Sequence, residues 1–86
     1  MFSIELTDEA KKDLKKLEKK EAEIILKKIY SIRSNPLHFI ERLSGVPLWK
    51  LRAGDYRAIL QVVTKDSMIR IIKIGHRGNI YKSLKQ

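Results

Sequence analysis

The chain has 86 residues and no cysteine, which excludes disulfides, Cys-based zinc sites and thiol chemistry. Its formal net charge is +9 at pH 7, and most of the excess lies in residues 46–86, where nine Lys and Arg face only Asp55 and Asp66. No apolar run reaches membrane-spanning length and no signal-peptide pattern opens the chain, so we expect a single cytoplasmic domain over residues 1–86 with no membrane partner.

The first half of the chain reads as one strand followed by two helices. Residues 2–6 alternate apolar and polar side chains, which predicts a short strand. Thr7 is placed to cap the helix that follows. Apolar residues recur at helical spacing over residues 10–17 and again over 22–32, with a charged break between them, and Pro36 follows the second run. We therefore predict two antiparallel helices joined by a tight turn.

The second half reads as an antiparallel sheet that follows an irregular connection over residues 36–47. Three strands are expected, at residues 48–53, 56–65 and 68–74. The third strand is apolar on both faces apart from two cations, so it should lie in the interior of the sheet. Residues 75–78 are expected to form a loop and residues 79–86 a short basic tail. The order β-α-α-β-β-β predicts an α+β fold, with the helical hairpin packed on one face of a three-stranded antiparallel meander.

Basic side chains share one face of the first strand in this meander. Trp49 and Leu51 fall on one face, which we assign to the core, and Lys50 and Arg52 fall on the other. A sheet face that carries unpaired cations is costly because the charges repel each other. A polyanion, most often a nucleic acid, would neutralise that charge.

The residue types of the basic half exclude most kinds of catalytic site. Acid pairs are absent there, and neither a phosphate-binding Gly loop nor a Ser-His-Asp arrangement can be built. The two histidines of the chain, His38 and His76, are too few for a His-based metal site. Lys, Arg and Tyr do suit phosphoryl chemistry on RNA. Cations stabilise charge on the phosphate, and the RNA supplies its own 2′-hydroxyl as nucleophile. We therefore expect no metal ion and no small-molecule cofactor.

Two segments of this half carry a family resemblance. They are Lys50-Leu51-Arg52-Ala53-Gly54-Asp55-Tyr56-Arg57 and, about 20 residues later, Ile74-Gly75-His76-Arg77-Gly78-Asn79-Ile80-Tyr81. Together with the opening strand, the Thr-Asp-Glu-Ala helix start and the Leu-Ser-Gly segment, they resemble RelE-type toxins of the RelE/ParE toxin–antitoxin superfamily. The compact ending is similar to archaeal members, and the resemblance covers essentially the whole chain.

The resemblance implies a toxin of a type II toxin–antitoxin system. Such a toxin is a metal-independent, ribosome-dependent endoribonuclease that cleaves mRNA in the ribosomal A site through 2′-hydroxyl attack and so inhibits translation. The implied partners are the ribosome, mRNA and a small RelB-like antitoxin. Positions that match catalytic residues of the family are Lys50, Arg57, Arg77 and Tyr81, and positions expected to bind RNA are Arg52, His76 and Lys82.

Some of the implied roles have alternatives. Arg57 matches an arginine that steadies the phosphate and Arg77 an arginine proposed as general acid, but arginine stays protonated in proteins, so His76 is the other candidate for that acid. Tyr81 either stacks on a nucleobase or plugs the edge of the sheet. Leu48 replaces a second catalytic lysine of bacterial members. This departure keeps two other functions open, a ParE-like toxin that binds DNA gyrase and an inactive RNA-binding module.

Overall fold

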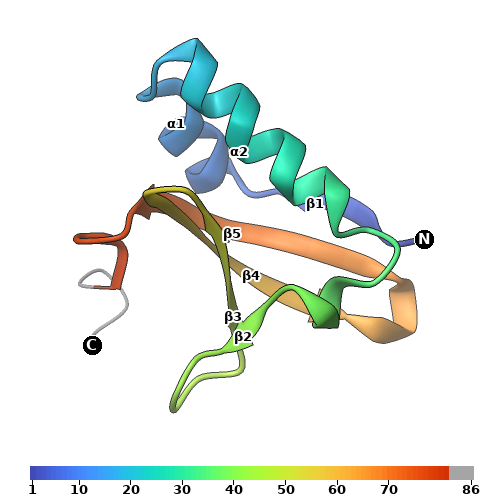
Figure 1. The fold of residues 1–86 in the computed structure, drawn as a ribbon. Helices are drawn as coiled ribbons and strands as arrows, with labels where there is room; N and C mark the ends of the chain where they lie inside the picture. Colours follow the sequence, from blue (N-terminus) through green and yellow to red (C-terminus); the bar gives the residue numbers. More distant parts are fainter. Residues whose placement is uncertain (82–86) are drawn as a thin grey trace.

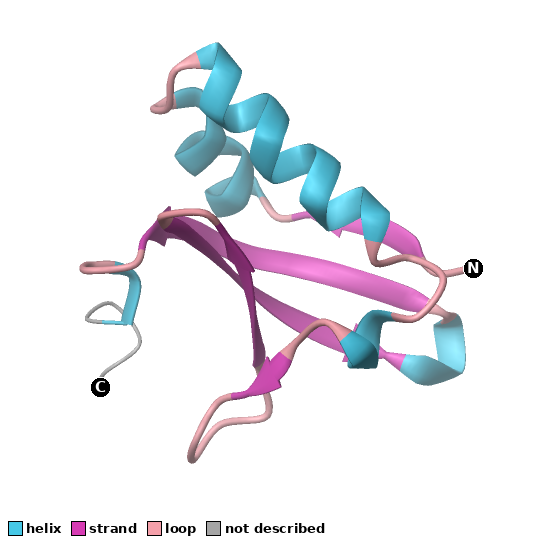
Figure 2. Cartoon of the chain, viewed as in Figure 1, coloured by secondary structure: helices cyan, strands magenta, loops and turns pink. Residues whose placement is uncertain are grey.

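The structure is a computed structural model in which residues 1–81 are described (Figures 1 and 2). Its helices are α1 (Asp8–Lys15) and α2 (Lys19–Ser31), and its strands are β1 (Ser3–Leu6), β2 (Glu41–Arg42), β3 (Trp49–Ala53), β4 (Tyr56–Val63) and β5 (Met68–His76). Short 3₁₀ helices cover Pro36–His38 and Thr64–Asp66. Lys82 and the rest of the predicted tail lie outside the described residues.

The strands form one sheet in the order β1-β5-β4-β3-β2. β1 pairs with β5 in parallel, and every other neighbouring pair is antiparallel. Both helices lie over one face of this sheet (Figure 1). The predicted α+β fold, its helical hairpin on one face and its meander are thus confirmed. β5 is interior as predicted, because it pairs with β1 on one side and β4 on the other.

Local chemistry sets where the helices begin and end. Thr7 caps α1 as predicted, since its hydroxyl oxygen accepts the Ala10 N–H at 3.1 Å. The same hydroxyl donates to the Ile72 carbonyl at 2.9 Å, which ties the start of α1 to β5. α1 ends at Lys15 and α2 begins at Lys19, so the predicted break falls between these residues.

The main core lies between the helices and the sheet. It is formed by buried aliphatic side chains of α2 and of the strands, among them Ile25, Ile29, Ile32, Leu51, Leu60, Ile69, Ile71 and Ile74. Burial of one such side chain stabilises a fold by about 1.5–3 kcal/mol. Ile59 and Ile80 are also buried, at 0% and 2% exposure, but they are not part of this cluster.

Three sequence-based boundaries are wrong. The connection over residues 36–47 contains the short edge strand β2, and β4 ends at Val63, two residues earlier than predicted. The loop expected at residues 75–78 begins later, because Gly75 pairs with Arg57 and His76 with Tyr56 at the end of β5. Glycine usually weakens a strand, but it also permits a close approach. A Cβ added at Gly75 would lie 3.4 Å from the Cβ of Ile80.

Candidate functional site

Three of the predicted site residues lie on the sheet face opposite the helices. Lys50 and Arg52 alternate along β3 with the buried Leu51, so they point away from the core. Arg52 lies directly opposite Arg57 of β4 in the antiparallel register. The register therefore brings these three cations close together. The turn that joins the two strands contains Gly54, whose φ of 64° suits a tight two-residue hairpin.

Arg57 is a buried cation held by backbone carbonyls. The residue is 8% exposed, and Nη1 donates to the carbonyls of Gly54 and Tyr56, each at 2.8 Å. Within residues 1–81 no buried side-chain nitrogen lacks a hydrogen-bond partner, so the remaining guanidinium N–H groups reach solvent. Two bonds thus fix the guanidinium, and its other donors stay available to an anion at the surface.

The segment after β5 brings two more predicted residues to this region. Ile80 packs against Gly75, next to the position of Arg57, and Tyr81 follows it. The Lys50 Nζ lies 5.6 Å from the centre of the Tyr81 ring, within cation–π range. Sequence reasoning treated Ile80 as part of a tail, but its burial is what holds Tyr81 beside Lys50.

Arg77 is anchored at the turn between β3 and β4. Its backbone N–H donates to the Asp55 carbonyl at 2.8 Å, and its side chain is exposed. His76, the residue before it, is also exposed, and its Nδ1 accepts the Gly78 N–H at 3.2 Å. The structure therefore brings Lys50, Arg52, Arg57 and Tyr81 together, anchors Arg77 at the adjoining turn, and sets the His76 ring against Tyr56, whereas Lys82 lies outside the described residues.

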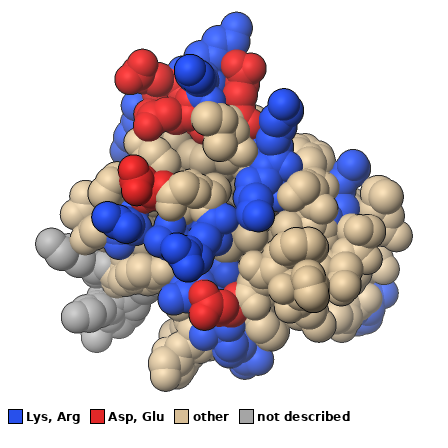
Figure 3. Space-filling model, viewed as in Figure 1, with Lys and Arg blue, Asp and Glu red and all other residues tan. Residues whose placement is uncertain are grey.

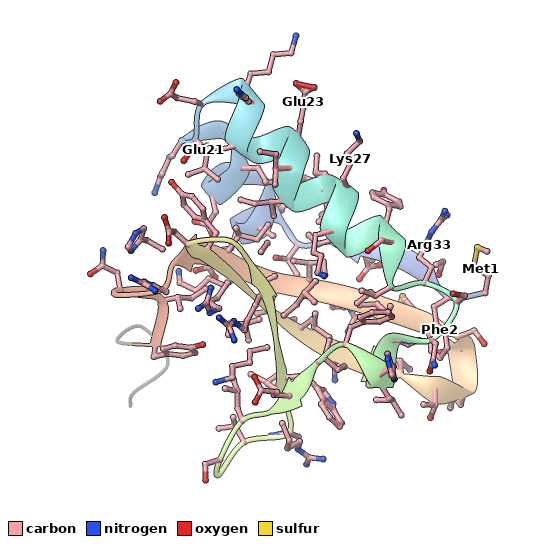
Figure 4. All side chains as sticks on the ribbon, in the orientation of Figure 1. Met1, Phe2, Glu21, Glu23, Lys27 and Arg33 are labelled. Carbon is pink, nitrogen blue, oxygen red and sulfur yellow. The ribbon has the colours of Figure 1, made fainter. Side chains whose placement is uncertain are left out.

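Tyr56 connects this region to the helical hairpin. Its ring meets the His76 ring edge to face at 5.7 Å, and its hydroxyl donates to Oε2 of Glu21 on α2 at 3.2 Å. Figure 4 shows Glu21 on the side of α2 nearest the sheet, whereas Glu23 and Lys27 point away from it. Burial raises the pKa of the Tyr56 hydroxyl, and the hydrogen bond to Glu21 and the nearby carboxylates add to this rise.

The cations of the site differ from Arg70 and Lys73 of β5 in having no acid partner within residues 1–81. On β5, Arg70 forms a salt bridge with Glu5 and Lys73 with Glu9. Within residues 1–81 none of the site cations, Lys50, Arg52, Arg57 and Arg77, forms a salt bridge. Figure 3 shows Lys and Arg side chains gathered below the helical hairpin, while many of the acidic ones lie over that hairpin. An uncompensated group of cations is a binding site for an anion such as phosphate.

Two further features are absent from the part of the chain that the structure describes. No three His, Asp or Glu side chains of residues 1–81 gather so as to hold a metal ion. Neither α1 nor α2 is long and apolar enough to cross a membrane.

Sequence reasoning missed two parts of the site. The first is the packing of Ile80 against Gly75, by which the C-terminal segment lies against β5. Its signal was present, because Ile80 is a large apolar residue in the predicted basic tail. The second is the link from Glu21 through Tyr56 to His76, which joins residues far apart in the sequence and has no signal in periodicity or charge.

Comparison with known proteins places the chain among toxins. The family model described as the ParE toxin of the type II toxin–antitoxin system parDE matches residues 4–81. The archaeal RelE–RelB complex from Pyrococcus horikoshii has a chain with 28% identity and a TM-score of 0.76, and the match covers 91% of this chain and 97% of that one. No curated protein matches significantly.

Two further structures extend the comparison. The isolated E. coli RelE toxin has 26% identity and a TM-score of 0.74, with 98% of this chain and 95% of that one covered. The toxin–antitoxin complex RelBE2 from Mycobacterium tuberculosis has a TM-score of 0.80 over 88% of this chain and 98% of that one. At 20% identity this last likeness shows the shared fold alone.

Proposed function

Because the chain belongs to the ParE toxin family of type II toxin–antitoxin systems and has the fold of RelE toxins, we propose that it is an endoribonuclease that cleaves mRNA in the A site of cytoplasmic ribosomes. One observation carries this proposal. Lys50, Arg52 and Arg57, none of which has an acid partner in residues 1–81, lie close together on one sheet face, and Lys50 lies beside the ring of Tyr81. This is the combination that single-stranded RNA requires, since cations bind its phosphates and an aromatic ring stacks on a base.

The proposed reaction uses the RNA as its own nucleophile. The 2′-hydroxyl oxygen attacks the adjacent phosphorus, the bond from phosphorus to the 5′-oxygen breaks, and the products are a 2′,3′-cyclic phosphate and a free 5′-hydroxyl. Lys50 takes the proton of the attacking hydroxyl. Arg57, with guanidinium donors facing solvent, stabilises the charge that develops on the phosphate. Arg77 or His76 supplies the proton to the leaving oxygen.

Cleavage of a defined mRNA in a translation extract tests the proposal. Primer extension should reveal cuts within codons, and these cuts should require translation of the message. Arg77→Ala should remove the cuts, whereas Arg70→Ala, which alters a cation already paired with Glu5, should retain them. Absence of cuts by the unaltered protein, or equal cutting of mRNA without ribosomes, would contradict it.

A second candidate function is inhibition of DNA gyrase without RNA cleavage. Two observations favour it, namely the match to the ParE model and the presence of Leu48 where bacterial RelE toxins carry a lysine. The chain should then inhibit supercoiling by purified gyrase, and toxicity should persist in Arg77→Ala. The remaining reading, an inactive RNA-binding module, predicts RNA binding with neither activity.

The proposed antitoxin partner has a suitable surface beside α2. Structures of RelE in complex with RelB, such as that from P. horikoshii, support a RelB-like partner. Here Ile24 is 54% exposed in the centre of two adjoining grooves. Their other lining residues are Lys20, Glu23, Leu26, Lys27, Lys28, Tyr30, Arg52, Ala53 and Gly54. Apolar side chains flanked by lysines and an arginine fit an acidic amphipathic segment of an antitoxin.

This assignment of the antitoxin surface can be tested with two matched variants. Ile24→Asp should abolish co-purification with a RelB-like antitoxin partner. Leu37→Asp, which alters an equally exposed leucine (52%) outside the grooves, should leave co-purification unchanged. The reverse result would place the antitoxin elsewhere on the protein.

A further inference from the structure

The turn that carries Arg77 is held by three consecutive backbone N–H groups. The Arg77 N–H donates to the Asp55 carbonyl at 2.8 Å, the Gly78 N–H to Nδ1 of His76 at 3.2 Å, and the Asn79 N–H to the His76 carbonyl at 2.9 Å. His76 therefore accepts two of the three bonds, one through its backbone and one through its ring. The Arg77 side chain projects from a turn whose shape depends on that ring.

The bond to Gly78 fixes the state of the His76 ring. A neutral imidazole carries one hydrogen, so a ring that accepts at Nδ1 carries its hydrogen on Nε2. A protonated imidazole has hydrogens on both nitrogens and cannot accept. Protonation therefore removes the bond between the ring and the Gly78 N–H. The new Nδ1–H of His76 and the Gly78 N–H, both donors, then face each other without an acceptor.

The ring is also oriented from outside the turn. Tyr56, its cross-strand neighbour on β4, meets it edge to face, and the Tyr56 hydroxyl is held by Glu21 of α2. Within residues 1–81, charged groups near the ring include Glu21 and Glu18, both reached through Tyr56, and Asp55 and Arg77 in the adjoining turns. Within residues 1–81 none of them forms a salt bridge with His76.

We propose that neutral His76 is a positioning residue, which accepts the Gly78 N–H at Nδ1 and so holds Arg77 at the cleavage site, and that protonation of His76 releases this turn. The effect on cleavage rests on the proposed function, because it acts through Arg77. The toxin would then be less active in acid than at neutral pH. This role differs from that of a general acid, which would use Nε2 and would touch the substrate.

Two substitutions separate these roles. The side-chain oxygen of His76→Asn can replace Nδ1 as an acceptor for the Gly78 N–H, and it does not titrate. The longer side chain of His76→Gln places its amide near the position of Nε2 and does not replace Nδ1. The rate to measure is single-turnover cleavage of ribosome-bound mRNA between about pH 5 and 8, the range in which histidine changes charge.

The proposal predicts a specific pattern. At the upper end of the pH range His76→Gln should cleave about two- to tenfold more slowly than His76→Asn, as expected for one lost hydrogen bond. As the pH falls, the wild-type rate divided by the His76→Asn rate should drop by a similar factor. A loss of about 100-fold in both variants would instead make His76 the general acid. A constant ratio, or a wild-type rate in both variants, would overturn the proposal.

A second measurement does not depend on cleavage. The NMR signal of the Gly78 amide should move as His76 titrates in the wild-type protein and should stay in place in His76→Asn. This result would hold even if the protein did not cleave RNA, so it distinguishes failure of the positioning role from failure of the proposed function. A Gly78 amide signal that is insensitive to pH in the wild-type protein would overturn the proposal on its own.

Discussion

Two groups of cations on the same sheet differ in what the fold provides for them. Arg70 and Lys73 on β5 point to β1 and α1, where Glu5 and Glu9 pair with them. Arg57 and Arg77 lie at the other end of the sheet and have no acid partner within residues 1–81. The sequence alone presents all of these as members of one basic half. The fold divides them, because the acids that compensate β5 come from the first half of the chain.

Pairing with an acid adds little to the stability of the fold, so stability does not explain why one group of cations is paired and the other is not. Exposed salt bridges contribute about 0–1 kcal/mol, so Arg70 and Lys73 gain little from their partners. A buried charge without a counter-ion costs far more, and Arg57 offsets this cost with two carbonyl acceptors instead of a carboxylate. A carboxylate would neutralise the charge, whereas carbonyls orient the guanidinium and leave its charge for a ligand. The unpaired group is therefore the one to expect at a phosphate.

The largest effect should come from removing an unpaired arginine. Arg57→Gln and Arg77→Gln should each lower the single-turnover rate of mRNA cleavage by about 10²–10³, the usual loss for one preorganised group that stabilises a developing charge. Arg70→Gln should retain the wild-type rate within about twofold, since a surface substitution of this kind has a small effect. Equal losses in all three variants would mean that net charge, and not the unpaired group, drives cleavage.

Two tyrosines, one at the site and one on α2, provide a second comparison between the site and the rest of the surface. Tyr81 lies beside Lys50, and Tyr30 is exposed on α2. If Tyr81 stacks on a base, Tyr81→Ala should weaken binding of the scissile RNA by about 1–3 kcal/mol, and Tyr81→Phe should be mild because the ring is kept. Tyr30→Ala should leave cleavage unchanged. A Tyr81→Phe variant as weak as Tyr81→Ala would assign the function to the hydroxyl.

If Tyr81 instead plugs the edge of the sheet, the same variants should give a different result. In that case Tyr81→Ala should lower the melting temperature by about 4–8 °C for each kcal/mol lost, as expected for a domain of this size. Its cleavage activity should then recover when the assay is cooled. Thermal unfolding of both Tyr81 variants, measured beside the cleavage rates, separates plugging from stacking.

The salt dependence of RNA binding should distinguish the two groups of cations more finely. Each phosphate contact with a single strand contributes about 0.7 to the slope of log K against log salt concentration. Arg52→Gln should therefore reduce the slope for a single-stranded RNA by about this amount. Arg70→Gln should leave the slope unchanged, because Glu5 already neutralises Arg70. Filter binding over a salt series checks both, and a smaller slope in Arg70→Gln would place the RNA across β5 as well.

The fold was predictable wherever the signal was local. Alternation in β1 and β3, the Thr7 cap and the two apolar helical stripes each reflect contacts within a few residues, and the structure confirms them. The parallel pairing of β1 with β5 was not predicted, because it joins the two ends of the chain and depends on the helical crossover. β2 was missed because two residues are too few to show alternation.

The candidate site was predictable in its membership but not in its arrangement. The resemblance to RelE-type toxins supplied Lys50, Arg57, Arg77 and Tyr81, and strand alternation placed Lys50 and Arg52 on one face. The acceptors of Arg57, the packing of Ile80 and the ring contact of His76 depend on tertiary structure. Neither charge nor periodicity encodes them. The division of cations into paired and unpaired groups could not be predicted from the sequence either. The partners Glu5 and Glu9 are more than 60 residues away in the sequence from the cations that they pair with.

The smallest predicted effect concerns Tyr56, which links the helical hairpin to the site. Burial, followed by the hydrogen bond to Glu21, raises the pKa of this tyrosine above its usual value of 10.0 in the folded protein. The unfolded chain therefore loses this proton first as the pH rises. The contribution of Tyr56 to the free energy of unfolding is fully present below pH 10.0 and declines as the pH increases from there through the folded pKa.

Urea unfolding of the wild-type protein and of Tyr56→Phe should show this decline. Between about pH 9 and 11 the wild-type protein should lose more stability than Tyr56→Phe, which has no proton to lose at this position. Tyr30→Phe is the matched control, because Tyr30 is exposed on α2, and it should lose stability with pH as the wild-type protein does. The absorbance of tyrosinate should show one late-titrating group that is absent from Tyr56→Phe. If that group persists in Tyr56→Phe, the hydroxyl of Tyr56 is not held by Glu21 in solution, and the link from α2 to the His76 ring is broken at its first step.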